Sequence, residues 1–364
     1  MRTLIAVAAY PDLSGGRALY YVHSRNLYYK KSRIDVTVLD FSAVKDYEID
    51  GIRVVSLATY ERQLADYDIL IFHAANLRNH YRFLCRYNNR FKKKLFIFHG
   101  HEVLIQDKHY PPPYAYRDRG PLRRVAISIY DRLKLRIWRR YFLKHIDDIR
   151  LIFVSDWLFR QFLEGLDLER EALGSHGVVI SNGVGEFFLE HSYQPSSIAY
   201  DFITIRNYLD ESKYGVDIVV RLAKSHPSYR FLVIGKGEFF RRVGCPDNLT
   251  WLDKELSHED MKGYIDSARY ALLPTREDTQ GLMACEMAVY GIPLITSDIE
   301  ICREVFEGCS RVALIDNDAP DLERAIASLD TRWPDDWDRY YPDKTIYREI
   351  EYIKAYVGSD TDPV

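Results

Sequence analysis

The segment from Pro274 to Asp298, PTREDTQGLMACEMAVYGIPLITSD, carries side chains whose types and spacing suit chemistry. Two of its carboxylates, Asp278 and Glu286, stand eight positions apart on either side of Gly281. If a helix begins near Gly281, Asp278 lies in the preceding loop and Glu286 in the second helical turn. Doubly wound sheets bind ligands at the carboxyl ends of their strands, where free N–H groups of a helix N-terminus attract anions. Because a carboxylate accepts two hydroxyls well, one acid suits a sugar and the other a ribose.

Short apolar runs bounded by turn residues supply the strands that such a site needs. They cover residues 3–10, 33–41, 68–74, 94–100, 151–155 and 178–184, and then 200–206, 229–237, 249–253, 270–275 and 293–298. Enough chain for a crossover helix separates neighbouring runs, and helical patterns fill residues 216–226 and 257–268. This alternation predicts an α/β protein with two Rossmann-like, doubly wound sheets.

The expected organisation is two domains and a tail. Residues 1–190 form the first domain, the polar stretch 191–200 is the linker, and residues 201–332 form the second domain. The tail, residues 333–364, is rich in aromatic and charged side chains and is predicted to form helix that packs back on the first domain. A length of 364 residues with 47% hydrophobic and 28% charged residues agrees with two globular domains.

Composition excludes several classes of protein. The five cysteines lack CxxC spacing, which argues against a zinc site or a disulfide framework. The opening apolar run breaks at Pro11, and no later run is long enough to span a membrane, so a cytoplasmic protein is expected. Residues 1–190 hold 30 Lys/Arg against 22 Asp/Glu, whereas residues 191–364 hold 20 against 31. The first half is therefore basic and suits an anionic partner.

Several sequence motifs for other chemistries are absent or incomplete. There is no Walker A motif and no GxSxG nucleophile elbow. The glycine loop GKGEFF has Phe240 where a third glycine would complete a dinucleotide fingerprint, and the first strand is not followed by GxGxxG. An NAD-dependent oxidoreductase is thus a weak alternative. Asp316 and Asp318 flank Asn317 like a DxD metal site, but they precede a helical pattern that aspartate simply caps, so no metal is predicted.

The segment that begins near Asp278 resembles the signature of retaining GT-B glycosyltransferases of the sucrose-synthase-like class, glycosyl transferases group 1. That signature is EGFGLPxLEAMACGxPVI, and the matching residues here are Gly281, Leu282, Glu286, Gly291 and Pro293. The chain departs from the signature by placing Asp278 where the first Glu is usual, with Glu277 beside it. Either Glu277 or Asp278 can therefore be aligned with the first acidic position. The stretches DTQG and CEMA resemble those of a subgroup associated with bacterial surface polysaccharides.

Further matches follow in the family's order. In the first domain, Gly15 and Gly16 resemble the loop whose amides approach the donor diphosphate, and His99 and Glu102 resemble the HG loop near the transferred sugar. The SNGV element at residues 181–184 resembles the end of the family's first domain.

The second domain supplies the donor side of the resemblance. Arg206 stands where the family has a diphosphate-binding arginine, and Lys213 resembles its lysine partner with two extra residues between them. Gly235 and Gly237 resemble the glycine loop under the nucleotide. The resemblance implies that the donor is also lined by Glu277, Gly281, Leu282 and Met283.

The resemblance implies a GT-B fold and a hexosyltransferase that retains anomeric configuration. The donor would be a UDP-sugar or GDP-sugar, without a further cofactor or metal, and the acceptor a glycan or a lipid-linked molecule. His99, Asp278 and Glu286 are the expected catalytic residues. A nucleotide-sugar-binding protein without activity stays open as an alternative, because Asp278 replaces the usual Glu.

Residues 121–150 combine nine Lys/Arg with an apolar stripe at Leu122, Ala126, Ile129, Leu133 and Ile137. Either the stripe packs on the sheet, or the helix docks on the anionic inner face of the cell membrane, with Arg132, Arg136, Arg139 and Arg140 facing the lipid. The membrane role is predicted, and nucleic acid is not, because no binding motif accompanies the charge.

Overall fold

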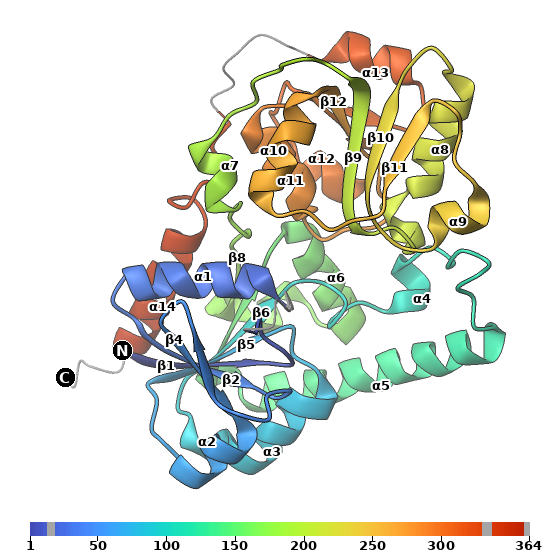
Figure 1. The fold of residues 1–364 in the computed structure, drawn as a ribbon. Helices are drawn as coiled ribbons and strands as arrows, with labels where there is room; N and C mark the ends of the chain where they lie inside the picture. The colour runs from blue at the N-terminus through green and yellow to red at the C-terminus, as the bar shows by residue number, and fades with distance from the viewer. Residues whose placement is uncertain (13–18, 330–336, 360–364) are drawn as a thin grey trace. The chain divides into compact units, whose positions relative to one another are not determined.

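The computed structural model describes residues 1–12, 19–329 and 337–359. The chain divides into two compact units (Figure 1). Unit 1 comprises Met1–Ile105, Ile129–Gly183 and Pro342–Val364, and unit 2 comprises Gln106–Ser128 and Val184–Tyr341. Within the described residues, no helix is both long enough and apolar enough to cross a bilayer.

Unit 1 contains an eight-stranded sheet in the order β3-β4-β2-β1-β5-β6-β7-β8. All neighbouring strands are parallel except β3 and β4, which form a hairpin. The strands are β1 Arg2–Val7, β2 Asp35–Asp40, β3 Tyr47–Ile49, β4 Ile52–Ser56, β5 Ile69–His73, β6 Lys94–Phe98, β7 Ile149–Phe153 and β8 Gly177–Val179. The strand order reverses between β1 and β5, and the carboxyl ends of central strands at such a point are where doubly wound sheets bind ligands.

The helices of unit 1 cover both faces of this sheet. They are α1 Tyr20–Lys31, α2 Leu57–Gln63, α3 Arg82–Tyr87, most of α5 Pro121–Lys144, α6 Asp156–Leu166 and α14 Ile346–Gly358. Alternate strand residues point to opposite faces. In β6, Leu95 and Ile97 join the core that includes residues of α1 and α14, whereas Phe96 packs against Trp138 and Phe142 of α5.

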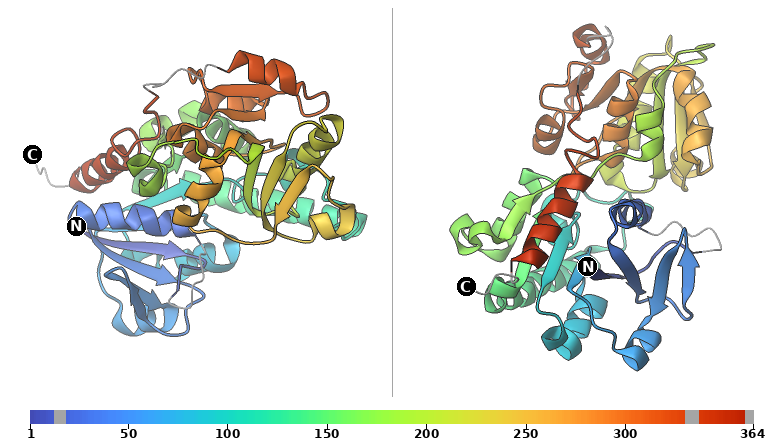
Figure 2. Two further views of the ribbon diagram at one scale, coloured as in Figure 1. Left: turned by 45° about the horizontal axis from the view of Figure 1, so that its top comes forward. Right: turned by 90° about the vertical axis from the view of Figure 1, so that its left-hand side faces the viewer.

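Helix α14 belongs to unit 1 although it comes from the end of the chain (Figure 2). Its Ile350 and Ile353 are buried in the core with Val22 of α1. A buried ion pair adds to this packing, because Arg25 Nε and Nη2 donate to the two carboxylate oxygens of Glu349 at 2.7 and 2.8 Å. Helix α14 of the predicted tail is therefore an integral part of unit 1, whereas residues 337–341 of the tail belong to unit 2.

Unit 2 contains a six-stranded parallel sheet in the order β11-β10-β9-β12-β13-β14. The strands are β9 Tyr200–Tyr208, β10 Phe231–Lys236, β11 Leu249–Leu252, β12 Ala268–Leu273, β13 Leu294–Ser297 and β14 Val312–Ile315. The helices are α4 Gln106–His109, α7 Glu186–Glu190, α8 Val216–Ser225, α9 Phe239–Val243, α10 His258–Asp266, α11 Leu282–Tyr290, α12 Glu300–Val305 and α13 Leu322–Ser328. The strand order reverses between β9 and β12, so the carboxyl ends of these two strands form the expected ligand edge.

The two largely parallel sheets confirm the predicted α/β architecture, while the limits of the units differ from the expected domains in three places. Unit 2 begins at Val184 rather than after residue 200, it ends at Tyr341 rather than at residue 332, and it also includes residues 106–128. Tyrosine side chains hold this inserted segment on unit 2. Tyr114 donates to Asp217 at 2.8 Å, and Tyr116 donates to Asp210 at 2.7 Å.

Candidate active site

The loop between β12 and α11 brings the acidic residues of unit 2 to the carboxyl end of β12. Gly281 precedes α11 with a left-handed φ of +73°, a conformation that glycine adopts without strain. Asp278 Oδ1 accepts the N–H groups of Thr279 at 2.8 Å and Gly281 at 2.9 Å. Asp278 therefore shapes the turn into the helix, a role that its short side chain suits better than a glutamate would.

Glu286 lies in the second turn of α11, as the sequence predicts, and is buried. The N–H of Gly185 donates to its Oε1 at 3.4 Å. Burial raises the pKa of Glu286 to about 8, and the Gly185 hydrogen bond only partly offsets this effect. Burial makes this carboxyl group costly to ionise, and a ligand that donates hydrogen bonds to it would stabilise its charged form.

Glu277 is the second buried acid of the same loop. Burial and the neighbouring Asp278 raise its pKa to about 8, while the charge of Lys213 lowers it. The two adjacent acids thus differ: Asp278 is held by backbone N–H groups, and Glu277 is held in a less polar setting close to a cation.

Arg206 and Lys213 flank one aromatic ring in unit 2. The guanidinium carbon of Arg206 lies 5.1 Å from the centroid of Tyr214, and Lys213 Nζ lies 4.9 Å from the same centroid. Arg206 is buried, and its Nη2 donates to the carbonyl oxygens of Leu273 at 3.1 Å and Pro274 at 3.0 Å. Burial lowers the pKa of Arg206, and the charge of Asp278 opposes that effect.

Lys213 comes from the 3₁₀ turn Ser212–Tyr214 that leads into α8. The sequence places two extra residues between it and Arg206, yet the two cations still meet at Tyr214. The structure therefore brings the predicted diphosphate-binding pair together beside the acidic loop.

The glycine loop after β10 has close packing on Arg206. A Cβ atom on Gly235 would stand 2.0 Å from the carbonyl oxygen of Arg206, so only glycine fits there. Beyond Gly237, the N–H of Glu238 donates to both carboxylate oxygens of Asp210, at 2.9 and 3.1 Å. A carboxylate of the chain itself thus accepts from a loop amide expected to face the nucleotide.

In unit 1, His99 follows β6 and Glu102 lies on the turn beyond it. Glu102 is buried, and its Oε1 accepts the N–H of His99. The His99 ring packs against Tyr21 of α1, with centroids 4.7 Å apart, and its Nε2 lies 3.0 Å from Nδ1 of His73. Gly15 and Gly16 lie outside the described residues.

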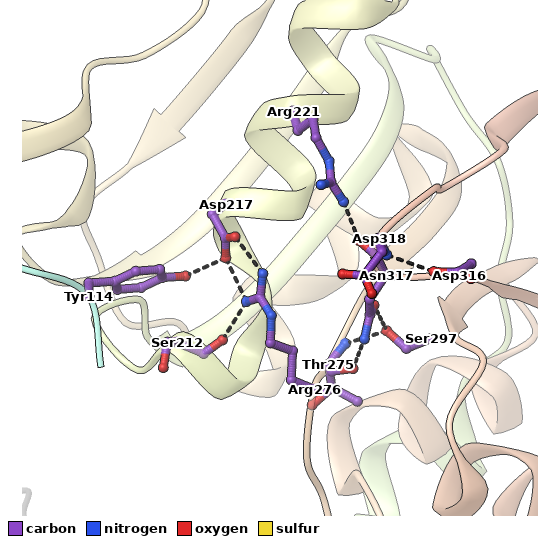
Figure 3. A network of polar contacts seen from close by, with 10 residues as sticks. All are labelled: Tyr114, Ser212, Asp217, Arg221, Thr275, Arg276, Ser297, Asp316, Asn317 and Asp318. Carbon is purple, nitrogen blue, oxygen red and sulfur yellow. Dashed lines mark hydrogen bonds and ion pairs between the residues drawn. The ribbon is translucent and has the colours of Figure 1, made fainter. Parts of the chain in front are cut away.

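A polar network behind the acidic loop was not predicted from the sequence (Figure 3). Arg276 Nη1 donates to Asp217 Oδ1 at 2.8 Å and to the carbonyl of Ser212 at 2.8 Å, and its Nη2 donates to Asp217 Oδ2 at 2.5 Å. Tyr114 completes the group by donating to Asp217. These contacts join the loop that carries Glu277 to the turn that carries Lys213.

The other side of the same loop is held by Asn317. Its Nδ2 donates to the carbonyl of Thr275 at 3.0 Å, and its Oδ1 accepts the hydroxyl of Ser297 at 2.6 Å (Figure 3). Asp316 accepts the N–H groups of Asp318 and Ala319 at 2.7 and 3.2 Å. Asp316 thus shapes a turn, and Asn317 braces the acidic loop.

Helix α5 has a different packing face from the apolar stripe seen in the sequence. Its buried residues are Ser128, Asp131, Lys134, Leu135, Trp138, Tyr141 and Phe142, which recur at helical spacing. Lys134 is therefore not a solvated residue. Its Nζ donates to Asp131 at 2.9 Å and to the carbonyl of His101 at 3.1 Å, so it holds the loop that follows His99.

The predicted stripe is instead exposed. Leu122 is 86% exposed, Ile129 61% and Leu133 53%, and Arg132, Arg136 and Arg140 are exposed as well. Arg139 differs from these three because its Nη2 donates to the carbonyl of Asp167 at 3.3 Å. The sheet-packing interpretation of the stripe is therefore wrong for these three apolar residues.

Residues 204–331 match the family model of Glycosyl transferases group 1. This range holds Arg206, Lys213, Glu277, Asp278 and Glu286. No curated protein sequence matches the chain.

Solved structures resemble the whole chain at low sequence identity. A sucrose-phosphate synthase from Thermosynechococcus elongatus has a TM-score of 0.61 and 14% identity, covering 90% of this chain and 87% of that chain. The structure named "Trehalose-6-phosphate from E. coli bound with UDP-2-fluoro glucose" has a TM-score of 0.60 and 13% identity, covering 98% of this chain and 95% of that chain. WaaG, a glycosyltransferase involved in lipopolysaccharide biosynthesis, has a TM-score of 0.58 and 12% identity, covering 90% of this chain and 89% of that chain. The chain therefore has a glycosyl transferases group 1 domain at residues 204–331, within a fold of the GT-B glycosyltransferase type.

Proposed function

We propose that this protein is a glycosyltransferase that moves a sugar from a nucleoside-diphosphate sugar to a glycan or lipid-linked acceptor. The observation that carries the proposal is the gathering of two cations, Arg206 and Lys213, with the two acids of the loop after β12, inside the range that matches the family model. The buried acid Glu286 lies on the helix that follows this loop. Cations suit a departing diphosphate, and carboxylates suit sugar and ribose hydroxyls.

Each residue has a chemical role in this proposal. Arg206 and Lys213 stabilise the negative charge that develops on the leaving diphosphate, which is an electrostatic contribution by preorganised groups. Glu286 accepts the ribose hydroxyls, and Asp278 or Glu277 accepts hydroxyls of the transferred sugar. Because Arg206 and Lys213 supply positive charge, the reaction needs no metal ion, and activity is expected to survive excess EDTA.

The proposed reaction retains anomeric configuration, as the sequence resemblance implies. The bond between the anomeric carbon and the diphosphate oxygen breaks, and a bond from the acceptor oxygen to that carbon forms on the same face. The acceptor proton passes to the departing phosphate oxygen, so the products are the glycosylated acceptor and a free nucleoside diphosphate. His99 contacts the sugar or the acceptor.

The exposed stripe on α5 supports a membrane-associated setting. Apolar Leu122, Ile129 and Leu133 share this helix with exposed Arg132 and Arg136. An exposed helix with apolar and basic side chains suits the interface of an anionic leaflet. We place the protein in the cytoplasm, at the inner face of the cell membrane, in surface-polysaccharide synthesis. WaaG, which shares the fold, is named for lipopolysaccharide biosynthesis.

A panel of UDP-sugars and GDP-sugars tests the donor site by thermal shift. A true donor at about 100 times its dissociation constant is expected to stabilise the protein by roughly 2.7 kcal/mol. Stabilisation without release of nucleoside diphosphate in the presence of membrane lipid acceptors would favour a binding protein over an enzyme. No shift with any nucleotide sugar would contradict the proposal.

A further inference from the structure

A short segment of unit 2, residues 110–117 with the sequence YPPPYAYR, is anchored beside the carboxyl end of β9. Its Tyr114 donates to Asp217 at 2.8 Å. Its Tyr116 donates to Asp210 at 2.7 Å. Each of the three prolines between its first two tyrosines fixes its own φ, so this span has few conformations available. The segment therefore holds its first tyrosine in a defined place.

This first tyrosine, Tyr110, contacts Lys213. The centroid of its ring lies 5.2 Å from Lys213 Nζ, and the centroid of Tyr214 lies 4.9 Å from the same atom. Both distances are within the range of a cation–π contact. Because Tyr214 also contacts Arg206, Tyr110 is the ring that the two cations do not share.

The main chain of Lys213 is fixed separately from its side chain. Its carbonyl oxygen accepts the N–H of Arg276 at 2.7 Å and the hydroxyl of Thr275 at 3.0 Å. Both donors belong to the loop between β12 and α11. These bonds leave the four-carbon side chain of Lys213 free to rotate, and ordering a lysine side chain costs more entropy than ordering most others. Restraint of the ammonium is therefore left to the two rings.

The rings hold the Lys213 ammonium without cancelling its charge. Among the residues that the structure describes, Lys213 forms no ion pair. Its charge still acts on the acidic loop, because burial raises the pKa of Glu277 and Lys213 opposes that rise. The positive charge of Lys213 is thus available to an anion that binds beside this loop.

We infer that Tyr110 is a positioning residue that holds the Lys213 ammonium in place for the diphosphate of the bound donor. Without the Tyr110 ring, the ammonium would gain freedom in the empty protein, and donor binding would have to order it again. The contact uses the face of the ring and not its hydroxyl, so phenylalanine should replace tyrosine at this position. The inference rests on the proposed function for the identity of the ligand.

Carbon-13 NMR of the ligand-free protein with labelled lysine tests the contact without any nucleotide. The Lys213 signal is assigned by its loss in Lys213→Met. Ring currents should place the Cε protons of Lys213 upfield of those of exposed lysines. Tyr110→Leu should move them toward the ordinary position, and Tyr110→Phe should keep them in place. A Lys213 signal that Tyr110→Leu leaves unchanged would overturn the inference.

Calorimetric titration with UDP and GDP supplies the second readout. Tyr110→Leu should weaken binding of the nucleotide that wild type prefers by about fivefold, while Tyr110→Phe should stay within about twofold of wild type. In the Lys213→Met background, Tyr110→Leu should cause no further loss, because its effect passes through the ammonium. Arg117→Gln is the matched control and should change binding by less than about twofold. It removes another cation–π contact of the same segment, in which the guanidinium carbon lies 5.6 Å from the centroid of Tyr208.

The pattern across these variants separates positioning of Lys213 from general loosening of the segment. Equal losses in Tyr110→Leu and Arg117→Gln, or a Tyr110→Leu loss that adds in full to that of Lys213→Met, would overturn the inference. A Tyr110→Phe variant as weak as Tyr110→Leu would do the same, since the hydroxyl would then be the group that matters. Wild-type protein that binds neither nucleotide, yet shows the expected Lys213 signals, would instead count against the proposed function alone.

Discussion

Asp217 and Arg276 form a two-point ion pair that ties the first turn of α8 to the loop between β12 and α11. The two contacts measure 2.8 and 2.5 Å, and Tyr114 donates to the same carboxylate. The pair lowers the pKa of Asp217 and raises the pKa of Arg276, so both groups stay charged. Since Arg276 directly precedes Glu277, this ion pair anchors the loop that carries the acids of the proposed donor site.

Replacing Asp217 with Asn is therefore expected to impair catalysis without touching the donor. The variant loses a charge-assisted contact worth roughly 1.5 to 3 kcal/mol, and transfer should fall by about tenfold as the loop loses its anchor. Steady-state kinetics with varied donor measure the effect. Asp298→Asn is the control, because it breaks the more exposed Arg303–Asp298 pair of the same unit. Equal activity of the two variants would show that the Asp217–Arg276 ion pair does not contribute to transfer.

Glu286 gives a pH dependence with a defined sign. Its folded pKa of about 8 lies above the unfolded value, so the protonated carboxyl favours folding at low pH. That contribution is present in full below about pH 4.5 and is lost as the pH rises toward 8. Between pH 5 and pH 8, the free energy of unfolding should fall more for wild type than for Glu286→Gln, by an amount on the order of 3 kcal/mol.

Urea unfolding of both proteins at pH 5, 6.5 and 8 measures this difference. Comparing each variant with wild type removes the contribution of the buried histidines of unit 1, which titrate in the opposite sense. Parallel pH profiles for the two proteins would mean that Glu286 is not in the buried, protonated state.

The ion pair between Arg25 and Glu349 should dominate the stability that α14 adds to unit 1. Both side chains are buried, and Tyr29 also donates to Glu349. Glu349→Ala leaves a buried cation without its partner and should cost about 3 to 5 kcal/mol. Glu351→Ala, at an exposed position of the same helix, should change stability by no more than about 0.5 kcal/mol. Thermal unfolding that ranks the two variants equally would contradict the packing described for α14.

Membrane binding through α5 should depend on lipid charge and on the exposed stripe. Changing Arg132, Arg136 and Arg140 to Gln should weaken cosedimentation with phosphatidylserine vesicles by about a hundredfold, because each basic residue contributes roughly 1 kcal/mol. The control changes Lys224, Arg242 and Arg269, three exposed basic residues of unit 2, to Gln. Binding that is insensitive to lipid charge or to salt, or equal loss in both triple variants, would remove α5 as the docking surface.

Strand positions and the acidic motif could be predicted from the sequence because continuous apolar runs and local turn residues determine them. Glu286 lies where the spacing from Gly281 places it. The β3–β4 hairpin was missed, although Asp50 and Gly51 both have positive φ and form the DG turn typical of such hairpins. The strands of this hairpin are short, and the polar residues beside them obscure the alternation of apolar and polar side chains that predicts a strand.

Long-range partners could not be predicted because no local pattern encodes them. Tyr114 is 103 residues from Asp217, and Arg25 is 324 residues from Glu349. The face of α5 that packs could not be predicted either, because Leu122, Ile129 and Leu133 of the expected stripe are exposed, whereas Trp138 and Phe142 are buried. Two apolar stripes share this helix, and sequence periodicity alone does not say which one the sheet covers.

Release of free nucleoside diphosphate is the most direct test of the proposed donor site. Wild type, Arg206→Ala, Glu286→Gln and the surface control Arg303→Ala are incubated with the nucleotide sugar that gives the largest thermal shift and with membrane lipid acceptors. Wild type and Arg303→Ala should release product at similar rates, and Arg206→Ala should be slower by about tenfold to a hundredfold, with Glu286→Gln at least as slow. Full turnover by both site variants, while all four proteins stay folded, would contradict the assignment of the donor site to unit 2.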